Sequence, residues 1–370
     1  MESIYQKYKL RNVINASGRM TNLGVSTPKM AVINQVVYGL NHYFEMKDLI
    51  DKTGEYIANL LKVENAVIVS CAAAGIVQSV AGIIVKDDRD LLLNLHNSDK
   101  PIPREIIVPK GHNVNFGAPI ETMVALGGGK VIEAGFANEC HVAHIEARIT
   151  SRTAAILYIK SHHTVQKNML TIIDAVAVAK KHGLPLIVDA AAEGDLTAYY
   201  NMGADLVIYS GAKAIEGPTS GLVIGKKHYI EWVKLQNNGI GRAMKIGKEG
   251  ILGLTYAIEL YLTTQKENGQ QMVERMRPFI EQLNVITGIA AKIVWDDAGR
   301  DIARTEIYFD EKAIGKNTFE IIAQLKQGDI AIYCREYKAN EGKIEVDIRS
   351  ITASQLNMIV SAIRQLISEA

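Results

Sequence analysis

A lysine set among small residues is the first feature of this sequence that could do chemistry. Lys213 lies in the stretch "SGAKAIEGPTSG", residues 210–221, between the apolar runs "ADLVIYS" and "GLVIG". Asp189 ends another apolar run, "LPLIVDA". A lysine amine forms a Schiff base with an aldehyde, and a carboxylate holds the protonated ring nitrogen of pyridoxal phosphate. The pair therefore predicts a site for this cofactor, against the alternatives of a solvated loop lysine and an aspartate that only caps a turn.

Further polar groups follow the neighbouring apolar runs. The run "NAVIVS" precedes small residues that open a helix, and helix N-termini bind phosphate through their backbone N–H groups. His112 follows "EIIVP" and is expected either on the face of the cofactor ring or as an ordinary surface histidine. His163 follows "AAILYIK" and is expected on the same rim, on the substrate side. The expected cofactor-binding set is Lys213, Asp189, Ser210, Cys71, Ala72, Ala73, Ala74, Gly75 and His112, with Lys213 as the catalytic residue.

The elements that must position these residues alternate along the chain. Between about residues 65 and 225, short β-branched runs alternate with helical patterns, which is typical of a mostly parallel sheet covered on both faces. Ligands of such sheets bind beyond the carboxyl ends of the strands, where the candidate residues lie. Residues 248–283 have the pattern of one long helix, and an α+β pattern with a half-exposed sheet follows. We expect a large cofactor-binding domain over residues 46–260 and a smaller domain formed by residues 1–45 and 261–370.

Composition places the chain among ordinary globular proteins. It has 370 residues, of which 48% are apolar and 22% charged, and its formal net charge is +1. This charge gives no field that would steer the chain to nucleic acid, and no apolar run is long enough to cross a membrane. The three cysteines, Cys71, Cys140 and Cys334, favour free thiols in the cytoplasm over a disulfide framework. We expect no metal, because Cys140, His141 and His144 lack a fourth ligand.

Several motifs together resemble one group of enzymes. Residues 15–24 read "NASGRMTNLG", and residues 188–193 read "VDAAAE". Lys213 lies in a Ser-Gly-x-Lys stretch that is followed by Gly-Pro and a further Gly. Residues 242–249 read "RAMKIGKE", and residues 346–350 read "VDIRS". In this order, over nearly the whole chain, the motifs resemble the selenocysteine synthase-like group of fold-type I (aspartate aminotransferase-like) pyridoxal phosphate enzymes.

The resemblance implies a fold of the α/β class and active sites at the boundaries of a homodimer or larger homo-oligomer. Selenocysteine synthases carry an additional N-terminal domain that helps to bind tRNA, and an arginine after Thr-Asn-Leu-Gly. Here the "INASG" motif begins at Ile14, which leaves no room for that domain, and Val25 replaces the arginine. The chain therefore resembles the shorter members of the group, ammonia-lyases that convert D-glucosaminate 6-phosphate to 2-keto-3-deoxygluconate 6-phosphate. The alternatives are a selenium transferase acting on seryl-tRNA and another β-eliminating or aldol enzyme acting on amino acids.

The resemblance also implies roles for individual residues. Lys213 would remove the proton at C2 and act later as an acid. Arg349, expected in a late strand, would bind the substrate carboxylate by bidentate geometry. The alternative for Arg349 is a surface pair with Asp347 or Glu345 on one face of an exposed strand. The substrate phosphate is expected at basic residues that reach in from a neighbouring subunit. The expected substrate-binding set is Arg349, Arg242, Lys245, His163 and Asn22.

Overall fold

The chain divides into two compact units. The computed structural model describes residues 3–161, 163–265, 267–296 and 299–368. The larger unit is Pro28–Thr264, and the smaller unit combines Met1–Thr27 with Gln265–Ala370. The first boundary falls before residue 46 because helix α2 (Met30–Asn41) packs on α11 (Lys248–Thr263) in the larger unit. A Cβ atom on Gly39 of α2 would lie 2.7 Å from the Glu249 Cα of α11, so the two helices are in close contact.

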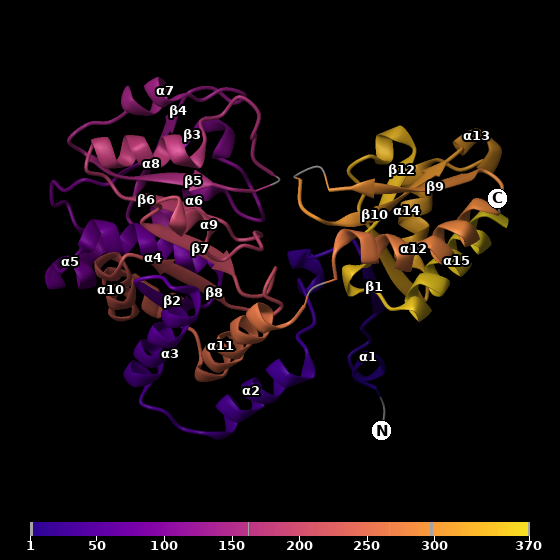
Figure 1. Ribbon diagram of the computed structural model, residues 1–370, viewed down its shortest axis with the longest axis horizontal. Coiled ribbons are helices and arrows are strands. Elements are labelled where there is room, and N and C mark those ends of the chain that lie inside the picture. Colours follow the sequence, from indigo (N-terminus) through magenta and orange to yellow (C-terminus); the bar gives the residue numbers. More distant parts are fainter. Residues whose placement is uncertain (1–2, 162, 266, 297–298, 369–370) are drawn as a thin grey trace. The chain divides into compact units, whose positions relative to one another are not determined.

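The larger unit is built on a seven-stranded sheet with the order β2-β8-β7-β6-β5-β3-β4 (Figure 1). All neighbouring strands are parallel except those on either side of β8, which is antiparallel to both β2 and β7. The prediction of a mostly parallel sheet is confirmed. The strands are β2 (Asn65–Val69), β3 (Glu105–Pro109), β4 (Lys130–Ala134), β5 (Thr153–Ile159), β6 (Leu186–Asp189), β7 (Leu206–Ser210) and β8 (Gly221–Gly225).

Helices cover both faces of this sheet, which is why its strands are apolar almost throughout. On β7, Leu206 and Ile208 point into one core, whereas Val207 and Tyr209 point into the other. Helices α4 (Ala72–Val85), α5 (Arg89–Asn94), α6 (Ile120–Leu126) and α10 (Lys227–Leu235) cover the first face. Helices α2, α3 (Met46–Leu61), α8 (Ile172–Lys181), α9 (Ala198–Asn201) and α11 cover the second. Among the described residues, no helix is long and apolar enough to cross a membrane.

The smaller unit has its own core between helices and two short sheets. Strands β9 (Ile289–Trp295), β10 (Ala303–Phe309) and β12 (Lys343–Val346) form an antiparallel sheet with β10 in the centre. Strand β1 (Asn12–Ala16) pairs in parallel with β11 (Ile330–Cys334). The helices of this unit are α1 (Ile4–Lys7), α12 (Gly269–Asn284), α13 (Glu311–Ile314), α14 (Thr318–Gln327) and α15 (Ala353–Ser368).

Two helix predictions are wrong. Residues 248–283 form two helices, because α11 ends at Thr263 and α12 begins at Gly269. The Asn268 side chain accepts a hydrogen bond from the Gln271 N–H while the Gln271 side chain binds the Asn268 N–H, and this capping box starts the second helix. The stretch "NECHVAHIEARI", predicted to be helical throughout, forms only the short helix α7 (Val142–Glu146).

Candidate active site

The carboxyl ends of the central strands bring the predicted cofactor residues of the larger unit to one rim. Asp189, the last residue of β6, lies in register between Ile159 of β5 and Ile208 of β7. Ser210, the last residue of β7, lies opposite Gly221 of β8. The turn that carries Lys213 begins immediately after Ser210, and the Lys213 N–H donates to the Ser210 carbonyl at 3.3 Å. Asp189, Ser210 and Lys213 therefore lie at the same edge of the sheet, the edge at which ligands of such sheets bind.

Asp189 is a buried carboxylate close to a lysine. Burial raises the pKa of Asp189 to about 6, against the opposing effects of a hydrogen bond from the Ala191 N–H (3.1 Å) and the charge of Lys213. The side chain is 6% exposed, whereas Lys213 is half-buried. A group that burial makes difficult to ionise is stabilised in its charged form by a cation beside it. The site is therefore suited to a further positive group next to Asp189.

The start of α4 forms a close backbone cradle at the same rim. A Cβ atom on Gly221 would lie 2.5 Å from the Cys71 carbonyl carbon and 2.8 Å from the Ala72 nitrogen, so only glycine lets β8 approach the helix start. The Cys71 sulfur accepts a hydrogen bond from the Ala74 N–H at 3.3 Å. The Gly75 N–H donates to the Cys71 carbonyl at 3.0 Å, which is the first bond of the helix.

The hydrogen bonds at the start of α4 reduce the number of predicted residues whose N–H groups can bind the phosphate of the cofactor. The N–H groups of Ala72 and Ala73 belong to the first turn of α4, where an anion is favoured. The expectation that the Gly75 backbone binds phosphate is wrong, because its N–H is used within the helix. Gly75 instead allows close packing, since a Cβ atom there would lie 2.9 Å from the Ile208 side chain.

His112 is part of the core, which corrects both expectations for it. The ring has no exposed surface, and its edge lies against Tyr158 with 4.5 Å between ring centroids. Its Nδ1 accepts from the Ile159 N–H at 3.4 Å, so Nε2 carries the proton and donates to the Val165 carbonyl at 3.2 Å. Burial lowers the pKa of His112 to about 4, despite the hydrogen bond to Val165. Because both nitrogens are held by backbone, His112 is a neutral structural residue rather than a cofactor-facing or surface one.

His163 lies on the rim in the part of the chain that follows β5. It is exposed, and its N–H donates to the Ser161 side chain at 3.2 Å. Desolvation and the charge of Lys213 both lower the pKa of His163, which favours the neutral imidazole. The same lysine therefore acts electrostatically on His163 and Asp189, which places the three side chains in one neighbourhood.

Arg349 belongs to the smaller unit, and it does not lie in the strand in which it was expected. The strand ends at Val346, and Arg349 lies in the 3₁₀ turn Ile348–Ser350, which Asp347 caps by accepting from the Arg349 N–H. Arg349 Nε and Nη2 donate to the two oxygens of Asp347 at 2.9 and 2.7 Å. The expected pair with Asp347 forms, but it lies in a turn rather than on an exposed strand, and the side chain of Asp347 has no exposed surface. Burial opposes the ionisation of Asp347, but Arg349 and Arg304 hold its pKa well below the usual range.

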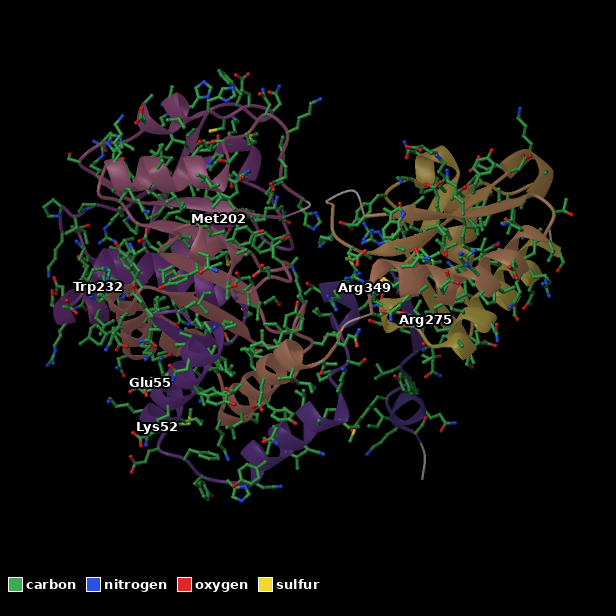
Figure 2. The ribbon with its side chains drawn as sticks, in the orientation of Figure 1. Lys52, Glu55, Met202, Trp232, Arg275 and Arg349 are labelled. Carbon is green, nitrogen blue, oxygen red and sulfur yellow. The ribbon has the colours of Figure 1, made fainter. Side chains whose placement is uncertain are left out.

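The backbone around Arg349 is fixed from two sides. Arg275 of α12, which is labelled with Arg349 in Figure 2, donates to the carbonyls of Ile348 and Ile351 at 3.1 and 2.9 Å. The "NASG" stretch, residues 15–18 at the end of β1, lies beside the pair, and the Asp347 N–H donates to the Ala16 carbonyl at 2.9 Å. Gly18 has φ +91°, and a Cβ atom there would lie 3.0 Å from the Asp347 carboxylate. The glycine of this motif is therefore required for both its conformation and its space.

The remaining predicted residues are exposed. Arg242 lies in the 3₁₀ turn Ile240–Met244 of the larger unit, and Lys245 follows it directly. Asn22 lies in the 3₁₀ turn Thr21–Leu23 of the smaller unit.

The chemistry of the rim fits pyridoxal phosphate. Asp189 can hold a cationic ring nitrogen, the first turn of α4 can hold a phosphate, and Lys213 can react with an aldehyde. The close approach of Gly221 to Cys71 and Ala72 is what a backbone phosphate cradle requires. Among the described residues, no group of three or more His, Cys, Asp or Glu side chains could hold a metal ion.

The sheet and its rim define a pyridoxal phosphate-dependent enzyme of fold type I, the aspartate aminotransferase-like class. The chain belongs to the L-seryl-tRNA selenium transferase (SelA) family, whose model matches residues 13–296. It is 42% identical over 370 residues to D-glucosaminate-6-phosphate ammonia lyase of Salmonella typhimurium, covering 100% of this chain and 99% of the relative. It is 34% identical over 366 residues to 5'-C-glycyluridine monooxygenase-decarboxylase of a Streptomyces species, covering 98% and 92%. A solved structure of D-glucosaminate-6-phosphate ammonia-lyase matches with a TM-score of 0.94 at 41% identity, covering 100% and 99%.

Proposed function

We propose that this enzyme removes ammonia from D-glucosaminate 6-phosphate and leaves a 2-keto-3-deoxy acid phosphate. The observation that carries the proposal is the buried Asp189 carboxylate at the rim that also holds Lys213 and the start of α4. The full-length similarity to an ammonia lyase supports the choice of substrate. The three cysteines are free thiols, which supports a cytoplasmic location.

Different residues of the chain have separate roles in the reaction. Bound pyridoxal phosphate supplies an electron sink, which makes the proton on the carbon next to the amine removable. Lys213 Nζ takes this proton from C2 and returns a proton later in the reaction. Asp189 would keep the ring nitrogen of the cofactor charged, and Ala72, Ala73 and Ser210 would hold its phosphate. Arg349 binds the substrate carboxylate. The water lost from C3 is balanced by the water that releases ammonia at C2, so the net change is the loss of ammonia.

The proposed function is tested by a panel of substrates with one purified enzyme. D-Glucosaminate 6-phosphate, unphosphorylated D-glucosaminate, free amino acids and seryl-tRNA are each incubated with the loaded enzyme, and ammonia and keto acid are assayed. We expect both products from the phosphorylated sugar acid at a rate well above those from the other compounds. Turnover of seryl-tRNA alone would favour the transferase reaction for which the family is named.

Arg242 is proposed to bind the substrate phosphate from a neighbouring subunit, because it is exposed in a single chain. Arg242→Ala should lower kcat/KM for D-glucosaminate 6-phosphate by at least about tenfold, since the phosphate loses a charged partner. The unphosphorylated acid should be affected much less. Arg89→Ala, which removes an exposed arginine at the start of α5, is the matched control and should change neither value. Equal losses on the two acids would exclude Arg242 as the phosphate-binding residue.

The homo-oligomer is proposed to form in part through α2. Met30, Ile33, Val37 and Leu40 are exposed and recur at three- and four-residue intervals, so they form one apolar stripe along the helix. Val37→Glu should place an unpaired charge in a subunit interface and raise the dissociation constant by at least about tenfold. Light scattering against concentration measures this shift. Leu93→Glu, at an exposed apolar residue of α5, is the control, and the same shift in both variants would remove α2 from the interface.

A further inference from the structure

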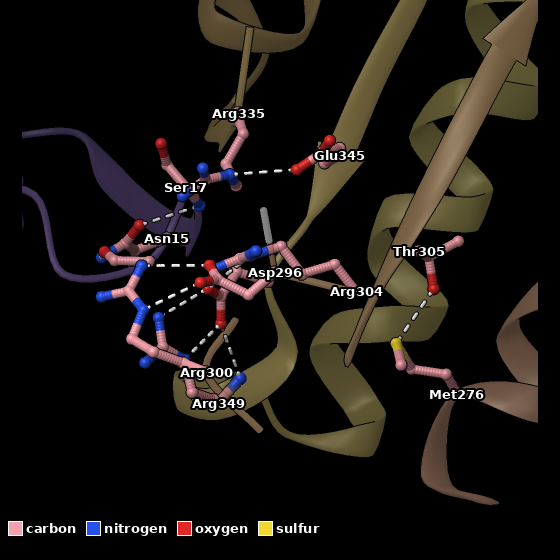
Figure 3. Close-up of polar contacts among 12 residues, drawn as sticks. Asn15, Ser17, Met276, Asp296, Arg300, Arg304, Thr305, Arg335, Glu345 and Arg349 are labelled. Carbon is pink, nitrogen blue, oxygen red and sulfur yellow. Dashed lines mark hydrogen bonds and ion pairs between the residues drawn. The ribbon is translucent and has the colours of Figure 1, made fainter. Parts of the chain in front are cut away.

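An alternating series of guanidinium and carboxylate groups runs through the smaller unit and includes Arg349 (Figure 3). Arg300 Nε and Nη2 donate to the two oxygens of Asp296 at 2.9 and 3.0 Å. Arg304 Nη2 donates to Asp296 Oδ1 at 2.7 Å, and its Nε donates to Asp347 Oδ2 at 3.2 Å. Arg349 then binds Asp347 through both oxygens. Arg304 is therefore the link between the two carboxylates.

The central groups of this series of ion pairs are buried, so a change in their geometry is energetically costly. Arg304 is 2% exposed and lies on the central strand β10, while the side chains of Asp296 and Asp347 are 3% and 0% exposed. Well-packed apolar residues stabilise a fold as well as a buried ion pair does, so stability alone does not explain the arrangement. Buried ionic groups can instead fix one conformation, and here the conformation that they fix is that of Asp347.

The two oxygens of Asp347 are held by different donors. Oδ1 accepts from Arg349 Nε and from the Arg349 N–H, at 2.9 and 3.3 Å. Oδ2 accepts from Arg349 Nη2 and from Arg304 Nε. Because Arg304 holds Oδ2 from the central strand β10, it also fixes the plane of the Asp347 carboxylate. The Arg349 guanidinium binds this carboxylate through Nε and Nη2, so its orientation is fixed as well. An arginine held in this way loses less side-chain entropy when it binds a ligand.

We infer that Arg304 is a positioning residue that orients Arg349 for the carboxylate of the substrate. It acts through Asp347 and does not touch the substrate itself. The inference rests on the proposed function, in which Arg349 binds this carboxylate. Arg300 binds Asp296, the other carboxylate that Arg304 contacts. Removal of Arg300 should therefore raise the KM for the acid as well, but by less than the change at Arg304.

The test compares two ligands that differ only at the carboxylate. D-Glucosaminate 6-phosphate is the substrate, and 2-amino-2-deoxy-D-glucitol 6-phosphate, with an alcohol at C1, is the competitive inhibitor. Arg304→Lys keeps the charge but not the fork of donors, so the KM for the acid should rise about tenfold while kcat changes less. The inhibition constant of the alcohol should stay within about twofold of wild type, because the alcohol has no charged partner for Arg349. A merely structural defect would alter both ligands together.

Control variants make the outcome decisive. Arg335→Met breaks another partly buried pair of this unit, with Glu345 at 3.1 Å, and should change neither constant. If Arg304→Lys does not fold, Arg300→Gln is used for the same comparison of the two ligands. Arg300 is partly exposed, and its substitution leaves Arg304 in place. An unchanged KM for the acid, or equal changes for acid and alcohol, overturns the inference. A wild-type enzyme that binds the alcohol as tightly as the acid would instead contradict the carboxylate role of Arg349, and thus the proposed function.

Discussion

Lys213→Ala is expected to reduce ammonia release from the sugar acid by at least about 10⁴-fold. The variant loses both the covalent partner of the cofactor aldehyde and the base that takes the C2 proton, and a positioned acid–base group alone contributes about 10²–10⁴-fold. Asp189 and the start of α4 do not depend on the lysine, so the variant should still bind cofactor non-covalently. Borohydride reduction of the loaded wild-type enzyme, followed by peptide mapping, should label the peptide that contains Lys213.

Two further variants separate the chemistry of Lys213 from its charge. Lys213→Arg keeps a positive charge near Asp189 but provides no group that can exchange a proton at pH 7, so its turnover should be as low as that of the alanine variant. Lys226→Ala removes a lysine after the far end of β8, where Nζ binds Asp205 at 2.5 Å, and should leave turnover intact. A reduced label on any other lysine, or wild-type turnover in Lys213→Ala, would exclude the proposed role.

The larger unit could be predicted from sequence because its signals are local. Each central strand is a short apolar run, and the turn after it carries the polar residues, so Asp189, Ser210 and Lys213 could be placed on one rim without coordinates. The break between α11 and α12 also has a local signal, since Asn268 precedes Gln271 with capping-box spacing. The helical apolar pattern continues on both sides of Asn268, so the pattern alone predicts one helix in spite of this capping signal.

The site residues that could not be predicted depend on contacts between distant segments. The alternation of residues 343–349 places Asp347 on an exposed strand, but it is buried by Arg304, which lies 43 residues earlier in the chain. No pattern around Arg304 or Arg275 indicates that either supports Arg349. The strand-end rule gives the position of His112 and not the direction of its ring, which is set by the Ile159 and Val165 backbone.

Asp189→Asn is expected to retain cofactor but to lose turnover by roughly 30- to 5,000-fold, which corresponds to the 2–5 kcal/mol lost when a buried charge loses its partner. The amide has a similar shape, and its oxygen can still accept the hydrogen bond from the Ala191 N–H. It cannot, however, stabilise a positive charge on the ring nitrogen. Cofactor absorbance measures binding, and ammonia release measures turnover. Wild-type turnover with bound cofactor would show that the carboxylate is not needed.

Asp189 should also make the stability of the cofactor-free protein depend on pH. The carboxylate ionises near 3.8 when unfolded and near 6 when folded, so between these values the folded protein keeps a proton that the unfolded chain has lost. The free energy of unfolding therefore falls as pH rises from about 4 to about 6, by about 3 kcal/mol at 1.36 kcal/mol per pH unit, and stays lower above pH 6. In cofactor-free Asp189→Asn this part of the fall should disappear. In the loaded wild-type enzyme it should shrink, because the cationic ring favours the ionised carboxylate. Urea unfolding at pH 4, 5, 6 and 7 measures the difference, and the same slope in stripped wild type and stripped Asp189→Asn would mean that this carboxylate does not titrate on folding.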